Sequence, residues 1–553
     1  MSQATSDLFD GPVEAAAGLA VYGAEAIDRS APASTRTALA ADDAARRLAE
    51  KDPTLWGPEA QDEAKIRLGW VDTFRRSREL LPQLAELQAE LADLDHVVLA
   101  GMGGSSLAPE VIARTTGRPL TVLDTTDPGQ VRAALAKRLH RTVVVVASKS
   151  GSTVETDSHR RAYWQAFLDS GLTEAEAGRR FVIVTDPGSP LATTANEMGA
   201  YVVLADSDVG GRYSALTAFG LVPAALAGVD VAELLDQAEA LAQSLAGNEG
   251  NPGLALGAAL GTAATTGRDK IALVSDGTGI EGLGDWIEQL IAESTGKTGI
   301  GILPVVVEGP HSPGATGDDV LTVTYGGALS AGAVPGNGVS PHLAVNGPLG
   351  AHFLAWEYAT AIAGVLLGID PFDQPNVTES KENTNRLLGS GLPAEAPAFT
   401  EGSIEVYAPA GTPGDLAGVL RWLVAGLGTE GYLAVMAYLD RFADADAART
   451  RPALAEVAGR PVTFGWGPRF LHSTGQYHKG GPQVGSFLQV TGAVSDDLPV
   501  PGKPYTFGEL QAAQAAGDRQ ALAERQRPVV RLHLTDRTAG LAQLLDTIRS
   551  LRS

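Results

Sequence analysis

Short runs of β-branched residues recur along this chain, and each ends in a glycine or serine turn that leads into a helical stretch. In the first half they cover 96–106, 142–153, 180–189 and 200–206. They return after residue 250 at 269–277, 299–309, 319–327 and, much later, 431–440. Strands that alternate with helices at this spacing indicate βα units and a largely parallel sheet. We therefore expect an α/β protein with two doubly wound parallel-sheet halves, with ligands at the carboxyl ends of the strands.

The same pattern suggests where the domains divide. Residues 1–90 are rich in Ala, Leu, Glu and Arg with apolar residues at helical spacing, which predicts an N-terminal helical region. We place the first α/β domain at 91–240 and the second at 241–553, the latter with a long C-terminal extension from about residue 400 whose purpose the sequence leaves open.

Composition excludes several classes of function. The 553 residues include no cysteine, which rules out disulfides, thiolate metal sites and a cysteine nucleophile. The net charge of −23 and the lack of a Lys/Arg cluster with interleaved aromatic residues argue against a nucleic-acid partner. The uncharged stretch 320–356 holds seven glycines and three prolines, so we expect no membrane span. The acidic opening lacks the positive charge of a signal peptide, and a cytoplasmic location is the default expectation.

Two strand ends carry small hydroxyl residues and glycines where a helix should begin. The first turn, 101–106, contains Gly104 and Ser105, and the second, 148–153, contains Ser148, Lys149, Ser150, Ser152 and Thr153. A helix start presents unpaired N–H groups and the positive end of the dipole, which suits a phosphate. Simple helix capping is the alternative, and it is favoured for the first turn taken alone. The lysine and the density of hydroxyls favour a phosphate at the second. Because the first turn has Ser106 where a dinucleotide fingerprint needs glycine, a nicotinamide cofactor is disfavoured.

Two residues are candidates for proton-transfer chemistry. Arg212 follows Gly210 and Gly211 and could stabilise an oxyanion, although a lone arginine more often forms a structural salt bridge. Glu293 falls in the last turn of an amphipathic helix expected over 284–297. The negative dipole end and partial burial should raise the pKa of a carboxyl group there, as a general base requires. The alternative is a solvated surface glutamate.

A candidate lysine lies in an early helical turn. After Pro375 we expect a helix capped by Asn376, with Glu379 completing a variant of the capping box. Lys381 follows one turn later, where the helix dipole disfavours a cation, so a functional role would explain it. Gln374 lies just outside the helix.

The glycine-bounded segment 469–481 gathers His472, Gln476, His478 and Lys479. Two histidines six residues apart with no third ligand make a weak metal signal, so we predict no metal. Among the nine histidines, these two have the most polar surroundings.

Taken in order, the motifs resemble one family. GGRYS, ESTGK and FDQ with a lysine seven residues beyond its glutamine are similar to signatures of the glucose-6-phosphate isomerase family, which has the sugar isomerase (SIS) fold. The resemblance runs over about 96–390 and is greatest to a divergent bacterial branch that also occurs fused to transaldolase. It implies SIS-type halves, reversible isomerisation of glucose 6-phosphate and fructose 6-phosphate through an enediol, no metal or organic cofactor, and a homodimer.

The resemblance also implies roles for individual residues. Glu293 would move a proton between C1 and C2, and Arg212 would stabilise the enediolate. Lys381 and Gln374 would contact the sugar and assist ring opening. The 6-phosphate would be held by Ser148, Lys149, Ser150 and Thr153, with Gly104 and Ser105 lining the sugar side. Ser152 and Gln476 are further candidate substrate contacts.

The chain departs from the family pattern in two places. The family carries a GTNGQH motif between the base and FDQ, whose histidine helps to open the ring from the neighbouring subunit. Here that interval is rich in Gly and Pro, and its histidines, His311, His342 and His352, lack that context. We expect His352, in an apolar helix, to be structural. HSTGQYHKGG (472–481) resembles the motif displaced toward the C-terminus, so we hypothesise that His472 or His478 replaces it. The FDQ motif continues as PNVTESK where the family has WGVELGK, which leaves the local sugar contacts open.

Two other functions remain open. A sugar-phosphate-binding SIS regulator would keep the phosphate turns but would not need both Glu293 and Lys381. An isomerase that also accepts mannose 6-phosphate would look the same in sequence, because pocket shape determines the stereochemistry accepted at C2.

Overall fold

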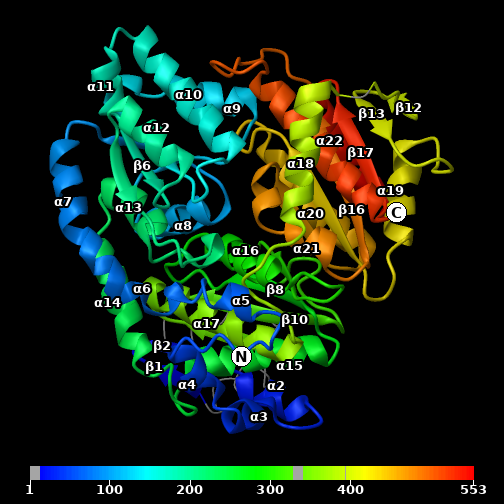
Figure 1. Ribbon diagram of the computed structural model, residues 1–553. Helices are drawn as coiled ribbons and strands as arrows, with labels where there is room; N and C mark the ends of the chain where they lie inside the picture. Colours follow the sequence, from blue (N-terminus) through cyan, green and yellow to red (C-terminus); the bar gives the residue numbers. More distant parts are fainter. Residues whose placement is uncertain (1–12, 328–340, 393, 553) are drawn as a thin grey trace.

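The structure is a computed structural model that describes residues 13–327, 341–392 and 394–552. Three β-sheets with flanking helices make up these residues, and Figure 1 shows that each sheet comes from a different part of the chain. The predicted parallel α/β class is confirmed. The third sheet, however, was not expected.

The first sheet lies closest to the predicted phosphate turns. Its order is β4-β3-β5-β6-β7 and all of its pairings are parallel. The strands are β3 (His96–Gly101), β4 (Thr121–Leu123), β5 (Thr142–Ala147), β6 (Phe181–Thr185) and β7 (Tyr201–Leu204). Its helices are α8 (Leu107–Thr115), α9 (Pro128–Ala136), α10 (Val154–Asp169), α11 (Glu174–Gly178) and α12 (Pro190–Met198). The chain winds from β3 to β4 and then crosses to β5 on the other side. The turns after β3 and β5 therefore meet at the switch point, where doubly wound sheets bind ligands.

The second sheet carries the candidate base. Its order is β1-β2-β11-β10-β8-β9, in which the last four strands are parallel. The strands are β1 (Val13–Ala16), β2 (Leu19–Tyr22), β8 (Lys270–Ser275), β9 (Leu303–Val306), β10 (Val320–Gly326) and β11 (Leu343–Asn346). Its helices are α15 (Pro252–Thr265), α16 (Leu283–Thr295) and α17 (Leu349–Leu367), and the chain then continues into α18 (Val377–Ser390), which lies beside the third sheet. Glu293 lies in the last turn of α16, which ends at Gly296 as predicted.

The N-terminal region is helical except at its beginning. β1 and β2 form a hairpin, and β2 pairs antiparallel with β11 at the edge of the second sheet. The apolar run of β2 is fully buried there, which a helix on the surface would not achieve. The helices are α2 (Ala24–Ser30), α3 (Thr35–Ala41), α4 (Ala44–Ala49), α5 (Gln61–Ala64), α6 (Thr73–Arg76) and α7 (Leu81–Glu90), with α13 (Ala218–Leu226) and α14 (Val231–Ala242) linking the first two sheets in sequence.

The C-terminal extension forms the third sheet, with the order β12-β13-β17-β16-β14-β15. Its strands are β12 (Phe399–Glu401), β13 (Ile404–Tyr407), β14 (Tyr432–Tyr438), β15 (Val462–Trp466), β16 (Gly485–Gly492) and β17 (Val529–Leu534). Its helices are α19 (Leu416–Ala425), α20 (Thr450–Ala458), α21 (Gly475–Gly480), α22 (Phe507–Glu524) and α23 (Arg537–Ser550). The run at 431–440, expected in the second half, is β14 of this sheet. A βα pattern marks each unit but does not say which sheet it joins.

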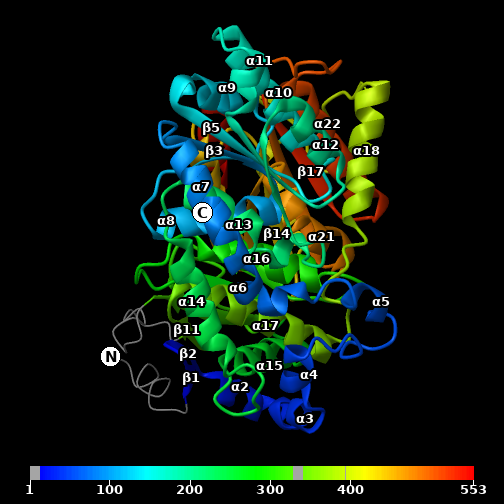
Figure 2. The ribbon, with the colours of Figure 1, turned by 60° about the vertical axis from the view of Figure 1, so that its left-hand side comes forward.

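The first and second sheets share one hydrophobic cluster, which includes Leu99, Leu273 and Val345. In Figure 2 helix α16 lies centrally, between the first sheet above it and α17 below. A separate hydrophobic cluster fills the third sheet, including Val435, Leu488 and Leu532. In the described ranges, no helix combines the length and the apolar character needed to cross a membrane.

Candidate active site

A cavity of about 610 Å³ lies at the switch point of the first sheet, facing the end of α16. Its lining includes most of the residues singled out in the sequence: Gly104, Ser105, Ser148, Lys149, Ser150, Thr153, Arg212, Glu293, Gln374, Lys381 and His472. These residues come from all three sheets and their connections. Three candidates are not part of this lining: Ser152, Gln476 and His478.

The second turn prepares the start of α10 for an anion. Thr153 occupies the N-cap position, but its side chain caps no backbone N–H of the helix. Its hydroxyl instead lies 2.9 Å from that of Ser148, and the hydroxyls of Ser150 and Ser152 are also 2.9 Å apart. A 16-residue helix thus begins with no side-chain cap beside several hydroxyls. Such an end favours a phosphate over simple capping. Ser152 faces a smaller adjoining cavity of about 100 Å³, which shares Ser150, Thr153, Lys381 and His472 with the larger one.

Lys149 lines the cavity but already has partners. Its ammonium group lies 2.7 Å from the carboxylate of Asp186 and donates to the carbonyl oxygens of Asp206 and Ser207, both at 3.2 Å. The lysine therefore also ties the second turn to the ends of β6 and β7.

The glycines of the first turn allow the backbone to pass close to other segments. A Cβ on Gly104 would lie 1.9 Å from the carbonyl oxygen of Gly211, and one on Gly103 would lie 2.8 Å from that of His472. Gly103 also has φ +56°, in the region that favours glycine. We expected this turn to approach a ligand closely. The structure adds that it packs against the two segments that carry Arg212 and His472.

The guanidinium group of Arg212 is buried, at 3% exposure, and fixed on several sides. Nε donates to Ser294 Oγ at 2.8 Å, and Nη2 donates to the carbonyl oxygens of Pro371 and Asp373 at 2.8 and 2.9 Å. Nη1 lies 3.4 Å from Glu293 Oε1. The arginine is thus held rigidly beside the candidate base, with which it forms a buried ion pair, so the structure keeps the structural salt bridge and places it at the cavity.

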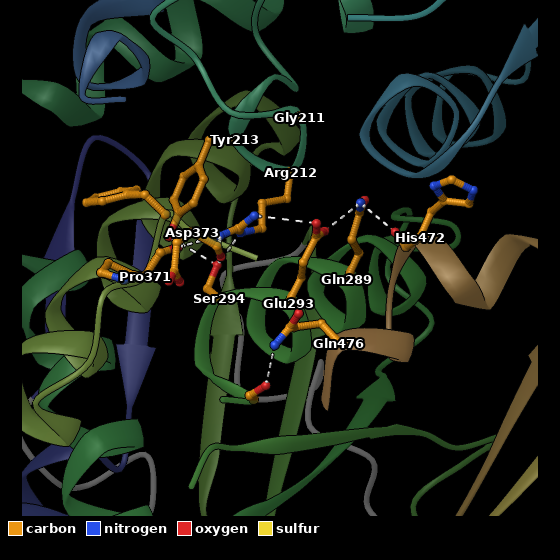
Figure 3. Close-up of polar contacts among 12 residues, drawn as sticks. Gly211, Arg212, Tyr213, Gln289, Glu293, Ser294, Pro371, Asp373, His472 and Gln476 are labelled. Atoms are coloured by element: carbon orange, nitrogen blue, oxygen red, sulfur yellow. Dashed lines mark hydrogen bonds and ion pairs between the residues drawn. The ribbon is translucent and has the colours of Figure 1, made fainter. Parts of the chain in front are cut away.

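Glu293 is itself 6% exposed and lines the cavity, so it is not a solvated surface glutamate. Gln289, one turn earlier on α16, donates from Nε2 to Glu293 Oε2 at 3.1 Å and to the carbonyl oxygen of His472 at 2.8 Å. Figure 3 shows Gln289 between Glu293 and His472, with Arg212 on the other side of the carboxylate. Gln289 therefore links the Glu293 carboxylate to the backbone of the segment that carries His472. The sequence analysis did not single it out, although its i, i+4 spacing from Glu293 was a usable signal.

Lys297 of the ESTGK motif anchors the loop that carries Gln374. Its Nζ donates to the carbonyl oxygens of Asp370 and Asp373, both at 2.7 Å, and pairs with the carboxylate of Asp373. Burial and the neighbouring Arg212 lower the pKa of Lys297 to about 8, although Asp373 opposes the shift. This loop also supplies two of the carbonyl groups that hold Arg212.

The helix with Lys381 begins as predicted but is held differently. Asn376 occupies the N-cap position of α18 without a capping bond from its side chain, and Glu379 pairs with Arg525 on α22. The predicted capping-box variant is therefore wrong. Gln476 replaces it: its Oε1 accepts from the Asn376 backbone N–H at 3.0 Å, and its Nε2 donates to Asn376 Oδ1 and to the carbonyl oxygen of Gly296. Gln476 is fully buried in this role rather than exposed to substrate.

The two candidate histidines occupy different environments. His472 lines the cavity, and its Nε2 lies 3.1 Å from Glu155 Oε1. His478 is buried away from the cavity, with Nδ1 3.0 Å from the hydroxyl of Tyr432 and its ring stacked on that residue. Burial, with Lys479 and Arg527 nearby, holds the pKa of His478 well below its ordinary value. The hypothesis of a displaced histidine thus narrows to His472.

Glu155, which the sequence analysis passed over, is the partner of His472. Gln514 on α22 donates to the same carboxylate oxygen at 2.7 Å. Burial acts to raise the pKa of Glu155, but His472, hydrogen bonds and Lys381 outweigh it and hold that pKa below the ordinary value. A carboxylate this close to one ring nitrogen orients the imidazole of His472.

The remaining histidine expectations can also be placed. His352 is fully buried, its Nε2 lies 3.0 Å from the carbonyl oxygen of Gly326, and burial lowers its pKa to about 4, as expected of a structural residue. Among the described residues, no group of three or more His, Asp or Glu side chains is placed to hold a metal ion.

Comparison with known proteins agrees with this geometry. The family model described as "Phosphoglucose isomerase" matches residues 88–305, which include both turns, Arg212 and Glu293. A glucose-6-phosphate isomerase of Rubrobacter xylanophilus is 30% identical over 366 residues, covering 54% of this chain and 82% of that protein. The chain belongs to the glucose-6-phosphate isomerase family.

Other members of the glucose-6-phosphate isomerase family support the assignment. A "Probable glucose-6-phosphate isomerase" from Natronomonas pharaonis is 29% identical over 359 residues, 56% of this chain and 83% of that protein. The crystal structure of a glucose-6-phosphate isomerase from Chlamydia trachomatis superposes with a TM-score of 0.54 at 19% identity, covering 71% of this chain and 92% of that one. That likeness shows a common fold.

Proposed function

We propose that this member of the glucose-6-phosphate isomerase family interconverts glucose 6-phosphate and fructose 6-phosphate through an enediol, using the residues of the 610 Å³ cavity. One observation carries the assignment of roles: Glu293 and Arg212, buried and 3.4 Å apart, line the same cavity as the uncapped start of α10. A carboxylate positioned by hydrogen bonds can move a proton, and a fixed guanidinium group can stabilise the negative oxygen that results.

The 6-phosphate is bound at the second turn. The N–H groups at the start of α10 and the hydroxyls of Ser148, Ser150 and Thr153 supply donors, and Lys149 adds positive charge while it remains paired with Asp186. Ser105 and Gly104 line the side of the cavity occupied by the sugar. Clamping the phosphate fixes the distance from the sugar carbons to the reacting groups.

Ring opening falls to His472, with Glu155 as the group that positions it and Lys381 nearby. The imidazole, positioned by Glu155, gives a proton to the ring oxygen as the C1–O5 bond breaks, while the proton of the C1 hydroxyl passes to solvent water, from which the imidazole is reprotonated. Lys381 and Gln374 contact the open chain.

Proton transfer between C1 and C2 then uses Glu293. The carboxylate removes the proton from C2 of the aldose, the electron pair moves to the C1 oxygen, and Arg212 stabilises the enediolate. The proton of the C2 hydroxyl then passes to the C1 oxygen, the protonated Glu293 returns its proton to C1, and the carbonyl forms at C2. No atom is gained or lost in the cycle, so one carboxylic group suffices for both half-reactions.

The direct test is a coupled assay. Purified protein, with no added metal or nucleotide, should convert fructose 6-phosphate to glucose 6-phosphate. A protein that binds the sugar phosphate without turnover would instead be a regulator, and the proposal would fail. Turnover of mannose 6-phosphate in the same assay distinguishes strict from relaxed stereochemistry at C2.

Two further proposals rest on the family resemblance. These are a homodimer, which sedimentation velocity measures directly, and a cytoplasmic location, which fractionation of cells measures.

A further inference from the structure

Helix α22, labelled next to α18 in Figure 1, brings a side chain of the C-terminal extension to Glu155. This side chain is Gln514, whose Nε2 donates to Glu155 Oε1 at 2.7 Å. His472 Nε2 lies 3.1 Å from the same oxygen. Glu155 is in the first turn of α10, which flanks the first sheet, whereas Gln514 and His472 both belong to the extension. One carboxylate oxygen therefore receives side chains from two separate segments of the extension.

A hydroxyl group of the first sheet fixes the orientation of the Gln514 amide. Thr126, which follows β4 and is fully buried, donates from Oγ1 to Gln514 Oε1 at 2.7 Å. Burial acts to raise the pKa of Glu155, but His472 and hydrogen bonds hold that pKa below the ordinary value, so the carboxylate can only accept. An amide turned by a half rotation would face Glu155 with its own acceptor oxygen. The Nε2 of Gln514 must therefore donate to Glu155, and for the same reason the Nε2 of His472 must carry a proton.

Gln514 is placed so that it acts on the catalytic cavity through Glu155. Gln514, Glu155 and His472 all line the adjoining cavity of about 100 Å³. Of these three, only His472 also lines the catalytic cavity of about 610 Å³. Gln514 is 2% exposed and Glu155 is 4% exposed, so both are shielded from water that could replace a lost donor. A flexible carboxylate side chain keeps one geometry only while such neighbours hold it.

We infer that Gln514 is a positioning residue for ring opening: it fixes the carboxylate of Glu155, which in turn fixes the imidazole of His472. The inference rests on the proposed function, because ring opening is a step of that reaction. It gives the C-terminal extension a second task besides supplying His472. Thr126 holds the amide and the amide holds Glu155, so the extension must be docked on the first sheet before the imidazole is aligned.

Kinetics of Gln514→Leu on cyclic and open-chain substrate tests this role. Turnover of the cyclic form should fall about 10-fold, because a hydrogen bond to a charged group is lost, while KM and turnover of the open-chain form change little. A purely structural role would lower turnover of both forms alike. Thr126→Val keeps the shape of the side chain but frees the amide to turn, so it should give a smaller loss of about 2–3-fold in the same direction. This second variant carries the test if Gln514→Leu does not fold.

Gln511→Leu is the matched control. Gln511 is on the same helix and is 4% exposed, but it lines a separate cavity of about 400 Å³ over the carboxyl ends of β14 and β16, at the switch point of the third sheet. Its substitution should leave the ratio of the two turnovers at the wild-type value. A double-variant cycle completes the set: in His472→Gln, adding Gln514→Leu should lower turnover by less than about 2-fold, because its effect passes through the imidazole.

A readout that does not need turnover separates this inference from the proposed reaction. Nitrogen NMR of the full chain with isotope-labelled histidine reports the tautomer of His472, whose signal is identified by its loss in His472→Gln. The neutral ring should hold its proton on Nε2 in the wild type, and Gln514→Leu should show a mixture of both tautomers, since a carboxylate released by its donor no longer selects one.

Two results would overturn the inference. They are a wild-type tautomer with an unchanged ratio of turnovers in both Gln514→Leu and Thr126→Val, and additive losses in the cycle with His472→Gln. A wild type without isomerase turnover, in which Gln514→Leu still changes the tautomer, would contradict the proposed reaction while it supports the positioning of the imidazole by Gln514.

Discussion

The crevices of the first and third sheets occupy equivalent places in two parallel sheets, yet they are built from different groups. At the first, glycines and short hydroxyls surround the start of α10, which has no side-chain cap and lies at the cavity. At the third, the start of α22 is capped by Thr506 and Glu509, and long side chains line the cavity. The same topology thus leaves one helix start open and closes the other.

This difference has an energetic consequence. Main-chain donors remain when a single side chain is replaced, whereas a site made of a few long side chains loses a larger share of its donors with each change. The two crevices also differ in their reactive groups. Among the described residues, only the first faces a buried carboxylate paired with an arginine.

The largest expected effect is the loss of that carboxylate. Glu293→Gln should fold normally and lower turnover by about 10²–10⁴-fold, because the proton between C1 and C2 loses its carrier. Glu288→Gln, on the same helix but lining a different cavity of about 240 Å³, is the control and should retain turnover. Steady-state kinetics measures both. Activity of Glu293→Gln within a factor of a few of the wild type would place the base elsewhere and remove the contrast between the crevices.

The next effect tests whether the third sheet contributes chemistry to the first crevice. His472→Gln should lower turnover of cyclic substrate by about 10–100-fold and affect the open-chain form much less, because only ring opening needs the imidazole. His478→Gln should mainly lower stability, since His478 is packed against Tyr432. Pre-steady-state kinetics with the two substrate forms separates them. Equal losses on both forms in His472→Gln would contradict the ring-opening role.

A smaller effect tests whether backbone N–H groups or side-chain hydroxyls dominate phosphate binding at the first crevice. Ser148→Ala and Thr153→Ala should each raise KM by about 2–5-fold with little change in kcat, because the N–H groups of α10 still hold the phosphate. A rise in KM of about 100-fold for either single variant would show that side chains, not the backbone, dominate the first crevice.

The smallest effect concerns the cavity of about 240 Å³ that Glu288 lines together with Asp285 and Glu308. These carboxylates make that cavity unsuited to an anion. Burial and the neighbouring Asp285 raise the pKa of Glu288 to about 8 in the folded chain. A raised pKa stabilises the fold fully below the unfolded value near 4.5, and this stability is lost as pH rises toward 8, at no more than about 1.4 kcal/mol per pH unit. Urea unfolding at pH 5 and pH 8 should therefore show a weaker pH dependence in Glu288→Gln than in the wild type. Identical pH dependence in the two proteins would contradict the shift.

The residues of the first crevice were largely predictable because each belongs to a pattern that a short stretch of sequence contains. Gly104, Ser148 and Thr153 belong to turns that follow recognisable strands, and the helix that carries Glu293 has a clear apolar stripe and a glycine stop. Patterns of this kind can be recognised in the sequence without knowledge of the tertiary fold.

The remainder could not be predicted because it depends on contacts between distant segments. Asn376 looked like a helix cap, but Gln476, 100 residues away in sequence, takes its side chain. Glu155 lies in the first turn of α10, where acids are common, and only the tertiary fold brings His472, 317 residues away, beside it. The βα pattern likewise could not show that 431–440 belongs to a separate sheet.

The position of His472 has a consequence for experiments with mixed populations. In a family where this residue comes from a neighbour, two defective variants can rescue each other by exchanging subunits. Here His472, Glu155 and Glu293 meet within one polypeptide. Mixing chains that lack the base with chains that lack the imidazole should therefore restore no activity, because the activity of each chain depends on its own residues.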